Sequence, residues 1–175
     1  MPVLSGTASA AMTPHRLSLL LLLVFIGCVS SDVRRQRAAA ADLASSIRVA
    51  DGIDLLSLEP GENVGATSGT FHRYEILGAV PVALVNRSVL AEALGEAVAA
   101  SRPRMVACFL PRHALRIRAA GAATDVVICF ECSTLYVKRE GSSQRFNVES
   151  SPETLLDSWL DAAGVARAVS PSGGS

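Results

Sequence analysis

The 175-residue chain carries no net charge and lacks an apolar run long enough to cross a bilayer. Lysine and arginine together number 16, as do aspartate and glutamate. This balance gives no general attraction to nucleic acid or to an anionic membrane surface. A membrane-spanning helix needs about 20 apolar residues, and the largely apolar run over residues 17–27 is too short for that. An uncleaved membrane anchor is therefore the least favoured interpretation of the N-terminus.

Recognisable catalytic motifs are also missing from the sequence. It shows no Ser, His and Asp in the order of a known hydrolase, no glycine-rich phosphate loop and no carboxylate pair in apolar surroundings. It contains no internal repeat. The question of an enzyme stays open at this point, but the sequence favours a non-catalytic protein without a resident cofactor.

The N-terminus carries the most specific signal in the chain. His15 and Arg16 precede the apolar run, whose length fits the hydrophobic region of a secretory signal peptide. The run ends in Gly27 and is followed at once by Cys28, which resembles the lipobox of bacterial lipoproteins. The resemblance implies cleavage before Cys28 and a diacylglyceryl group on its sulfur; two acyl chains give stable membrane attachment where one does not. An ordinary secretory signal with a chance cysteine is the alternative.

Composition divides the chain into four parts. Residues 1–27 are the expected signal peptide, and residues 28–46, rich in Ser, Ala and charge, are the expected lipidated cysteine and flexible tether. Residues 47–167 have enough apolar content for one folded domain. Residues 168–175, which contain "SPSGGS", are expected to be a disordered tail.

Hydrophobic periodicity in the domain predicts an α+β fold. Helices are expected over residues 86–101 and 150–165; the second has Pro152 at its start, Gly164 past its end and Trp159 on its buried face. We expect these two helices to pack on a mostly antiparallel sheet of about five to seven strands. The predicted strands are residues 53–60, 73–82, 104–110, 113–118, 124–132, 134–139 and 144–149.

Reactive side chains gather in residues 106–118 and 124–137. The candidate cluster consists of Cys108, Arg112, His113, Cys129, Glu131 and Cys132. The two segments should be neighbouring antiparallel strands, because their connection is too short for a parallel crossover. We expect residues 110–112 to break the first segment, leaving Arg112 and His113 near the sheet edge. Cys108 should then lie within two strand spacings of the C-x-x-C pair, and Glu131 can pair with Arg112 or Arg116.

The cysteines admit four interpretations. Cys108, His113, Cys129 and Cys132 have the ligand count of a Cys3His zinc site. A redox-active C-x-x-C pair is disfavoured, because no helix follows it and alternation puts its cysteines on opposite faces unless the strand ends between them. Export favours one disulfide with one buried thiol left over, and Cys108 could face either partner across neighbouring strands. The fourth interpretation is three buried thiols.

The segments "ACFLPRHALRI" and "TDVVICFEC" together resemble a family of small exported proteins of unknown function from bacteria such as planctomycetes and myxobacteria. Its members share C-F-x-P-R-H and, after a short spacer, D-x-x-I-C-F-x-C. The matching residues here are Cys108, Phe109, Pro111, Arg112, His113, Asp125, Ile128, Cys129, Phe130 and Cys132. The resemblance implies a single domain around this hairpin and a location in the cell envelope, and it implies no activity, cofactor or partner.

These features together predict an exported protein that is anchored by lipid in the bacterial cell envelope and serves as a binding or structural module. The alternative is a metal-binding or thiol-dependent protein that uses Cys108, His113, Cys129 and Cys132. The membrane is a predicted partner, through the lipid on Cys28. Nucleic acid is not, and the sequence names no ligand.

Overall fold

The computed structural model describes residues 14–62, 69–102, 104 and 108–168. The chain divides into two units, residues 1–35 and 36–175. Helix α1 (Pro14–Arg48) begins in the first unit and ends in the second. Within the described residues, no helix combines the length and the apolar character needed to cross a membrane. The beginning of the predicted signal peptide, residues 1–13, and all but the first residue of the predicted tail lie outside the described part of the chain.

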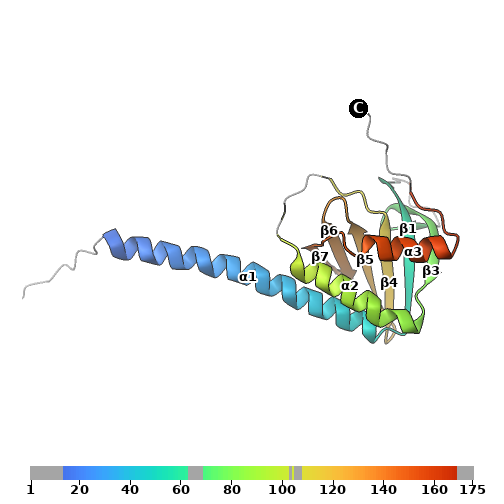
Figure 1. The fold of residues 1–175 in the computed structure, drawn as a ribbon, viewed down its shortest axis with the longest axis horizontal. Coiled ribbons are helices and arrows are strands. Elements are labelled where there is room, and N and C mark those ends of the chain that lie inside the picture. Colours follow the sequence, from blue (N-terminus) through green and yellow to red (C-terminus); the bar gives the residue numbers. More distant parts are fainter. Residues whose placement is uncertain (1–13, 63–68, 103, 105–107, 169–175) are drawn as a thin grey trace, which may run out of the picture. The chain divides into compact units, whose positions relative to one another are not determined.

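A seven-stranded antiparallel sheet forms the centre of the second unit (Figure 1). Together with the helices on it, this sheet confirms the predicted α+β class. The strand order is β2-β3-β1-β4-β5-β6-β7, so β4 is the central strand. The strands are β1 (Gly52–Glu62), β2 (Thr70–Phe71), β3 (Tyr74–Pro81), β4 (His113–Ala119), β5 (Ala122–Cys129), β6 (Thr134–Arg139) and β7 (Ser142–Asn147).

The predicted hairpin between the two reactive segments is present as β4 and β5. Its two-residue turn has positive φ at both Ala120 (49°) and Gly121 (78°), as the hairpin turns that match strand twist require. The register pairs His113 with Ile128 at the far end of the ladder. The segment before His113 is broken as predicted, because β4 begins only after Arg112.

The strand predicted over residues 104–110 is not observed at the described positions, residues 104 and 108–110. Instead, the Phe109 ring packs on the face of the sheet, edge-on to Tyr136 and Tyr74 with ring centroids 4.8 and 6.4 Å apart. Phe109 joins a small apolar cluster that contains Leu56, Leu58, Phe71, Tyr74, Ala114 and Val127. Side-chain packing, and not strand pairing, therefore holds Phe109 on the sheet.

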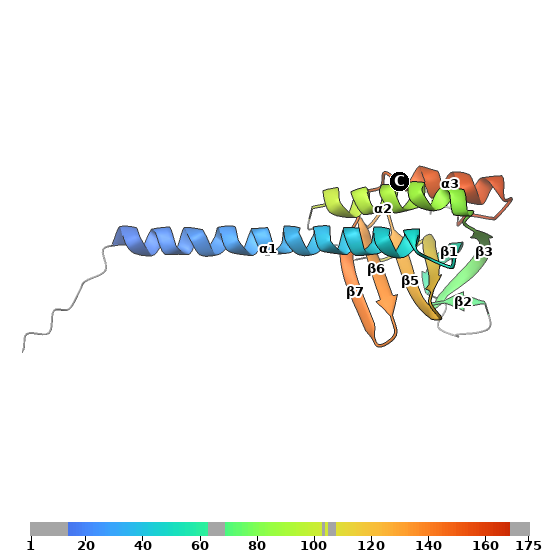
Figure 2. The same cartoon turned by 90° about the horizontal axis from the view of Figure 1, so that it is seen from below.

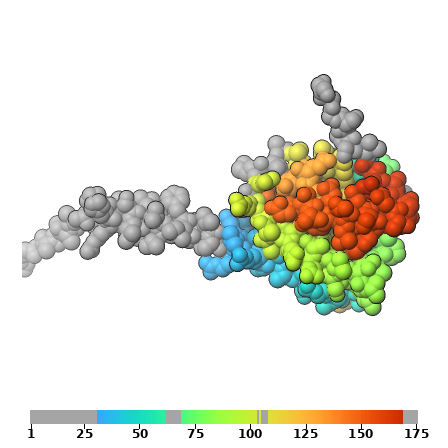
Figure 3. Space-filling model, in the orientation of Figure 1, coloured from blue at the N-terminus to red at the C-terminus, as the bar shows by residue number. Residues whose placement is uncertain are grey.

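The opposite face of the sheet is covered by helices (Figure 2). These are α2 (Arg87–Ala100), α3 (Glu153–Ala162) and the last turns of α1. In the space-filling view α2 and α3 cover much of this face (Figure 3). Three helices pack here, one more than predicted, because α1 contributes to the core.

The prediction that residues 28–46 form a flexible tether is wrong for residues 36–46. The side chains of α1 that enter the core are Ala40, Leu43, Ala44 and Ile47. Their i, i+3, i+4, i+7 spacing is that of a helix with one apolar face. The Gln36 amide also donates to the carbonyl oxygens of Val98 (2.9 Å) and Asn147 (2.7 Å). The folded domain therefore begins about three turns of helix earlier than predicted.

Glycine permits the close approach of α1 and α2. A Cβ atom built on Gly95 would lie 3.3 Å from the Cβ of Ala44 and 3.6 Å from the Ala40 carbonyl oxygen. A glycine inside a helix costs roughly 1 kcal/mol relative to alanine. The contact with α1 explains why a glycine is accommodated at this position.

The end of α3 is closed by a Schellman motif. The Val165 N–H donates to the Leu160 carbonyl, the Gly164 N–H donates to the Asp161 carbonyl, and Gly164 has φ of 69°. The motif turns Val165 onto β3, where its side chain lies over Gly78. Trp159 packs against the core only half-buried, so the prediction of a substantially buried tryptophan is met in part.

Candidate functional site

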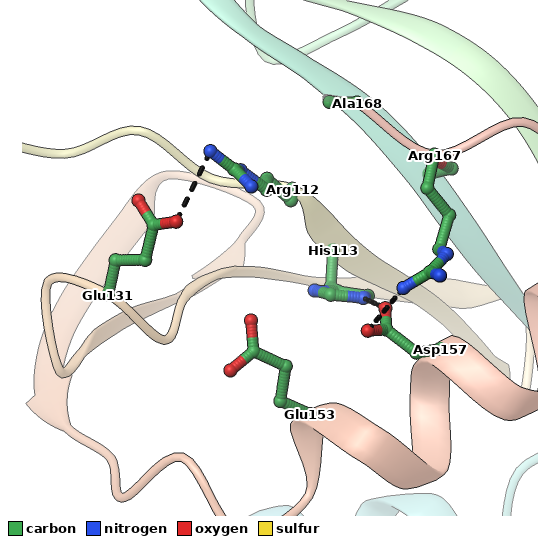
Figure 4. Close-up of a pocket in the computed structure, with 8 residues that line it drawn as sticks. Arg112, His113, Glu131, Glu153, Asp157, Arg167 and Ala168 are labelled. Atoms are coloured by element: carbon green, nitrogen blue, oxygen red, sulfur yellow. Dashed lines mark hydrogen bonds and ion pairs between the residues drawn. The ribbon is translucent and has the colours of Figure 1, made fainter. Parts of the chain in front are cut away.

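A pocket of about 380 Å³ lies at the end of the central strands, beside the start of α3. Figure 4 shows its side chains converging from the start of β4 and the residue before it, from the turn after β5, from α3 and from the segment after α3. The lining residues are Ser57, Arg112, His113, Glu131, Glu153, Asp157, Arg167 and Ala168.

Two neighbouring strands supply the floor of the pocket. Ser57 of β1 and His113 of β4 are direct partners in the antiparallel ladder. Alternation places both on the face that also carries Leu55 and Leu115, which is the helix-covered face. Their side chains are almost completely buried, with relative exposures of 1% and 3%. The sequence prediction that His113 lies near the sheet edge is wrong, because β4 is the fourth of seven strands.

The imidazole of His113 is tied to α3. Its Nε2 lies 2.8 Å from Asp157 Oδ1, and Asp157 Oδ2 lies 2.5 Å from Arg167 Nη1. Burial lowers the pKa of His113 below 6.5, and the neighbouring Asp157 only partly offsets this effect. The ring is therefore neutral at pH 7. Because a carboxylate accepts and does not donate, the single ring proton is assigned to Nε2, which leaves Nδ1 as an acceptor.

The second ion pair of the pocket joins the two predicted motif segments. Arg112 Nη2 lies 3.2 Å from Glu131 Oε1, and the Arg112 side chain is only 14% exposed. The Arg112 carbonyl accepts the Leu58 N–H at 2.9 Å, which extends the ladder between β1 and β4 by one bond. The predicted pairing of Arg112 with Glu131 is confirmed. Arg116, the other predicted partner of Glu131, pairs instead with Asp125.

Glu153 is the first residue of α3, and its carboxylate points toward the middle of the pocket (Figure 4). Burial raises its pKa above the ordinary value of 4.5, and the nearby carboxylates of Asp157 and Glu131 raise it further. The Arg112–Glu131 pair and the group of His113, Asp157 and Arg167 do not include Glu153. Arg112 and Arg167 nearby only partly offset this rise in the pKa, so the surroundings remain unfavourable for its negative charge.

The three cysteines of the domain lie together just beyond this pocket. Cys129 ends β5 and Cys132 follows on a turn, where the two form a disulfide with Cα atoms 5.2 Å apart. Cys108 keeps a free, exposed thiol, and its Sγ lies 3.5 Å from Cys132 Sγ. One disulfide with one buried thiol was among the predicted arrangements; the disulfide is present, but the remaining thiol, on Cys108, is exposed and not buried. The expected cross-strand partner is wrong, because the strand ends at Cys129 and the turn brings Cys132 back to it.

The predicted cluster of six residues is thus divided into two adjoining parts. Arg112, His113 and Glu131 line the pocket, whereas the three cysteines form a sulfur group. Among residues 31–61, 69–102, 104 and 108–168, no three His, Cys, Asp or Glu side chains are grouped as metal ligands would be. The zinc site stays a prediction that these observations leave untested.

Sequence reasoning missed four of the pocket residues, namely Ser57, Glu153, Asp157 and Arg167. Two of them, Ser57 and Asp157, lie beside His113 and so bring Ser, His and Asp together, as in a hydrolase triad. However, Ser57 Oγ is fully buried and makes no hydrogen bond with any described residue, so it does not contact His113 as a triad serine would. The arrangement fits a binding pocket better than a nucleophilic site.

Comparison with known proteins adds no relative. No family model, no curated protein and no solved structure matches the chain. The resemblance to the small exported bacterial proteins therefore stays a prediction. The pocket and the cysteines are the features of the structure that bear on function.

Proposed function

We propose that the protein is an exported, lipid-anchored module of the bacterial cell envelope that binds a small cationic ligand in the pocket beside α3. We infer that the ligand is a cation from the environment of the Glu153 carboxylate. It lies among two further carboxylates, and its pKa is raised by burial and by their charge. A positively charged group placed there would compensate this charge and return the pKa toward its ordinary range.

The other pocket residues define which cations fit. With Glu153 ionised, the pocket holds three carboxylates and two guanidinium groups, while His113 is neutral. The acceptor Nδ1 of His113 adds a neutral hydrogen-bonding group at the floor, whereas Ser57 Oγ beside it is fully buried. A primary amine or a guanidine that also carries a hydroxyl or N–H group therefore matches the pocket better than an anion does. A volume of about 380 Å³ suits a molecule of amino-acid size.

Two features support the location. The apolar run that ends in Gly27 and Cys28 has the form of a lipoprotein signal. The Cys129–Cys132 disulfide belongs to the kind of bond that forms in exported proteins and is rare in the reducing cytosol. In this proposal two acyl chains on Cys28 hold the protein at the membrane.

Binding is tested by titrating the full chain with ethanolamine, agmatine and arginine and, for comparison, with acetate and phosphate, using calorimetry. We expect one of the three cations to bind and Glu153→Gln to weaken it by about tenfold or more, since a close charge pair is worth at least 1.4 kcal/mol in a partly buried site. Glu140→Gln, an exposed carboxylate in the β6–β7 turn, is the matched control and should bind like the wild type. Preference for the anions, or binding that is equal in the Glu153→Gln variant, would contradict the proposed ligand class.

A further inference from the structure

The geometry points to a second activity in the same domain: we propose that Cys108, Cys129 and Cys132 form a thiol–disulfide exchange centre that accepts electrons from small thiols. This inference goes beyond the proposed binding function and does not depend on it. It rests on a free thiol in contact with a disulfide, one of them exposed and the other buried.

The three sulfurs differ in their access to solvent. Cys129 and Cys132 are 1% and 2% exposed, so an external thiol has little direct access to the disulfide. Cys108 is exposed, and its Sγ lies 3.5 Å from Cys132 Sγ. Thiol–disulfide exchange proceeds by attack of a thiolate on one sulfur of the disulfide. Cys108 is therefore placed between the solvent and the buried bond.

The exchange step is balanced within the protein. Cys108, as thiolate, attacks Cys132 Sγ; the Cys108–Cys132 bond forms, the Cys129–Cys132 bond breaks, and the electron pair leaves on Cys129 Sγ. The Cys132 N–H already donates to Cys129 Sγ at 3.2 Å. A donor at that position stabilises the negative charge that develops on the leaving sulfur. Cys129 takes up the proton that Cys108 lost, so the step involves no net oxidation.

The exchange replaces the buried Cys129–Cys132 disulfide by one in which the Cys108 sulfur is accessible to small thiols in solution. A small thiol attacks the exposed Cys108 sulfur, forms a mixed disulfide with it and releases Cys132 as a thiolate. A second small thiol then attacks the mixed disulfide and restores the Cys108 thiol. In total, two small thiols become one small disulfide, and the Cys129–Cys132 bond becomes two thiols.

Packing on both sides of Cys108 holds its thiol at this position. On one side, the Phe109 ring lies edge-on to Tyr136 with centroids 4.8 Å apart. On the other, the Arg104 carbonyl accepts from the Arg145 guanidinium at 3.2 Å. Both anchors lie on the β6–β7 side of the sheet, next to the turn that carries Cys132. These two contacts hold the described residues Arg104 and Phe109 near the turn, and Cys108 Sγ lies 3.5 Å from Cys132 Sγ.

The proposal is tested in the full chain carrying Cys28→Ser, so that these three cysteines are the only ones present. The rate at which glutathione reduces the Cys129–Cys132 bond is followed by trapping free thiols and by mass spectrometry. We expect Cys108→Ala to reduce the rate by about tenfold or more, because it removes the accessible attacking thiol. Leu110→Ala, an exposed position in the same segment, should keep the parent rate. An unchanged rate in Cys108→Ala overturns the proposal.

A second variant tests the intermediate directly. Cys129→Ala leaves the two sulfurs that lie 3.5 Å apart, and mild oxidation should give a Cys108–Cys132 disulfide. Cys132→Ala, which leaves Cys108 and Cys129, should form the corresponding bond at least about tenfold more slowly. Failure of Cys129→Ala to form its disulfide while circular dichroism shows the parent fold also overturns the proposal. The rate measurement on Cys108→Ala retains the native disulfide and decides the matter if Cys129→Ala does not fold.

Discussion

The imidazole Nε2 of His113 lies 2.8 Å from Asp157 Oδ1, and this contact joins the central strand to α3 across one wall of the pocket. His113 is 3% exposed, and its pKa is lowered chiefly by burial. The hydrogen bond therefore fixes a neutral ring in a site where protonation is unfavourable. Two consequences follow, one for the dependence of stability on pH and one for the effect of losing the ring.

We expect the free energy of unfolding to fall as pH drops below about 6.5, the ordinary pKa of histidine. Because the pKa of His113 is lower in the folded state, the unfolded state binds more protons in the window between the two values. Stability is fully present above 6.5 and is lost as pH falls toward the folded pKa, by up to about 1.4 kcal/mol per pH unit. Urea unfolding over a pH series measures this slope.

The variant His113→Gln keeps an N–H donor for Asp157 but cannot titrate, so it should lose this part of the slope. Glu153 acts in the opposite sense. Its pKa is raised, so the folded state binds more protons above 4.5 and stability falls as pH rises through that window. The comparison is therefore made in a Glu153→Gln background. Equal slopes with and without His113 in that background would show that the ring does not set the pH response.

Gly78 of β3 is expected to be intolerant of a side chain. A Cβ atom there would lie 2.6 Å from Val165 Cγ1, and Val165 is held in place by the Schellman motif after α3. Gly78→Ala should therefore lower the free energy of unfolding by about 1–3 kcal/mol, the usual cost of overpacking. Gly61→Ala in β1 is the matched control, since no atom of the residues that the structure describes lies within 4 Å of its Cβ position. Chemical denaturation should give a clearly lower free energy of unfolding for Gly78→Ala than for Gly61→Ala. Similar values would show that the Val165 side chain can move away with little loss of stability.

Asp125, a residue of the second motif, is expected to serve stability. Its carboxylate accepts from Arg116 Nε and Nη2 at 3.0 and 3.1 Å and contacts His72 Nε2 at 2.8 Å. Arg116 also lies over the Phe71 ring, 4.8 Å from its centroid. We expect Asp125→Ala to cost about 2–3 kcal/mol of unfolding free energy, because hydrogen bonds between charged groups in a largely buried site are lost.

The control for Asp125 is Asp161→Ala. Asp161 also pairs with an arginine, Arg167, but at 55% side-chain exposure. Exposed ion pairs contribute about 0–1 kcal/mol, so thermal unfolding should shift much less in this variant. If both variants lose the same stability, burial does not increase the contribution of the Asp125 contacts to the free energy of unfolding.

Local patterns predicted the sheet well because strand alternation is a local signal. The β4–β5 hairpin followed from a short connection, and the helix after Pro152 followed from its start and stop residues. Helix α1 was missed although Ala40, Leu43, Ala44 and Ile47 stand at helical spacing. Two of these four are alanines, whose small side chains make a weak apolar stripe in an alanine-rich segment.

The pocket was only partly predictable, because its residues meet through pairings that are distant in sequence. His113 faces Ser57 because β1 lies beside β4 with one particular register, and a shift by one residue would turn both side chains to the other face. Asp157 lies on the polar side of α3, and the sequence pattern predicted only which residues of that helix face the core. The disulfide depended on where β5 ends, and neither Gly nor Pro marks the turn at Ser133, which has φ of 45°.

The proposed location in the cell envelope depends most directly on the lipid on Cys28. The most direct measurement is mass spectrometry of the N-terminal peptide of the protein isolated from membranes of a bacterial host, together with fractionation of Cys28→Ser. We predict a mature chain that begins at Cys28 with a diacylglyceryl group on its sulfur, and release of the Cys28→Ser variant from the membrane fraction. A mature chain in the soluble fraction with an unmodified Cys28, or one that begins elsewhere, would contradict the proposal.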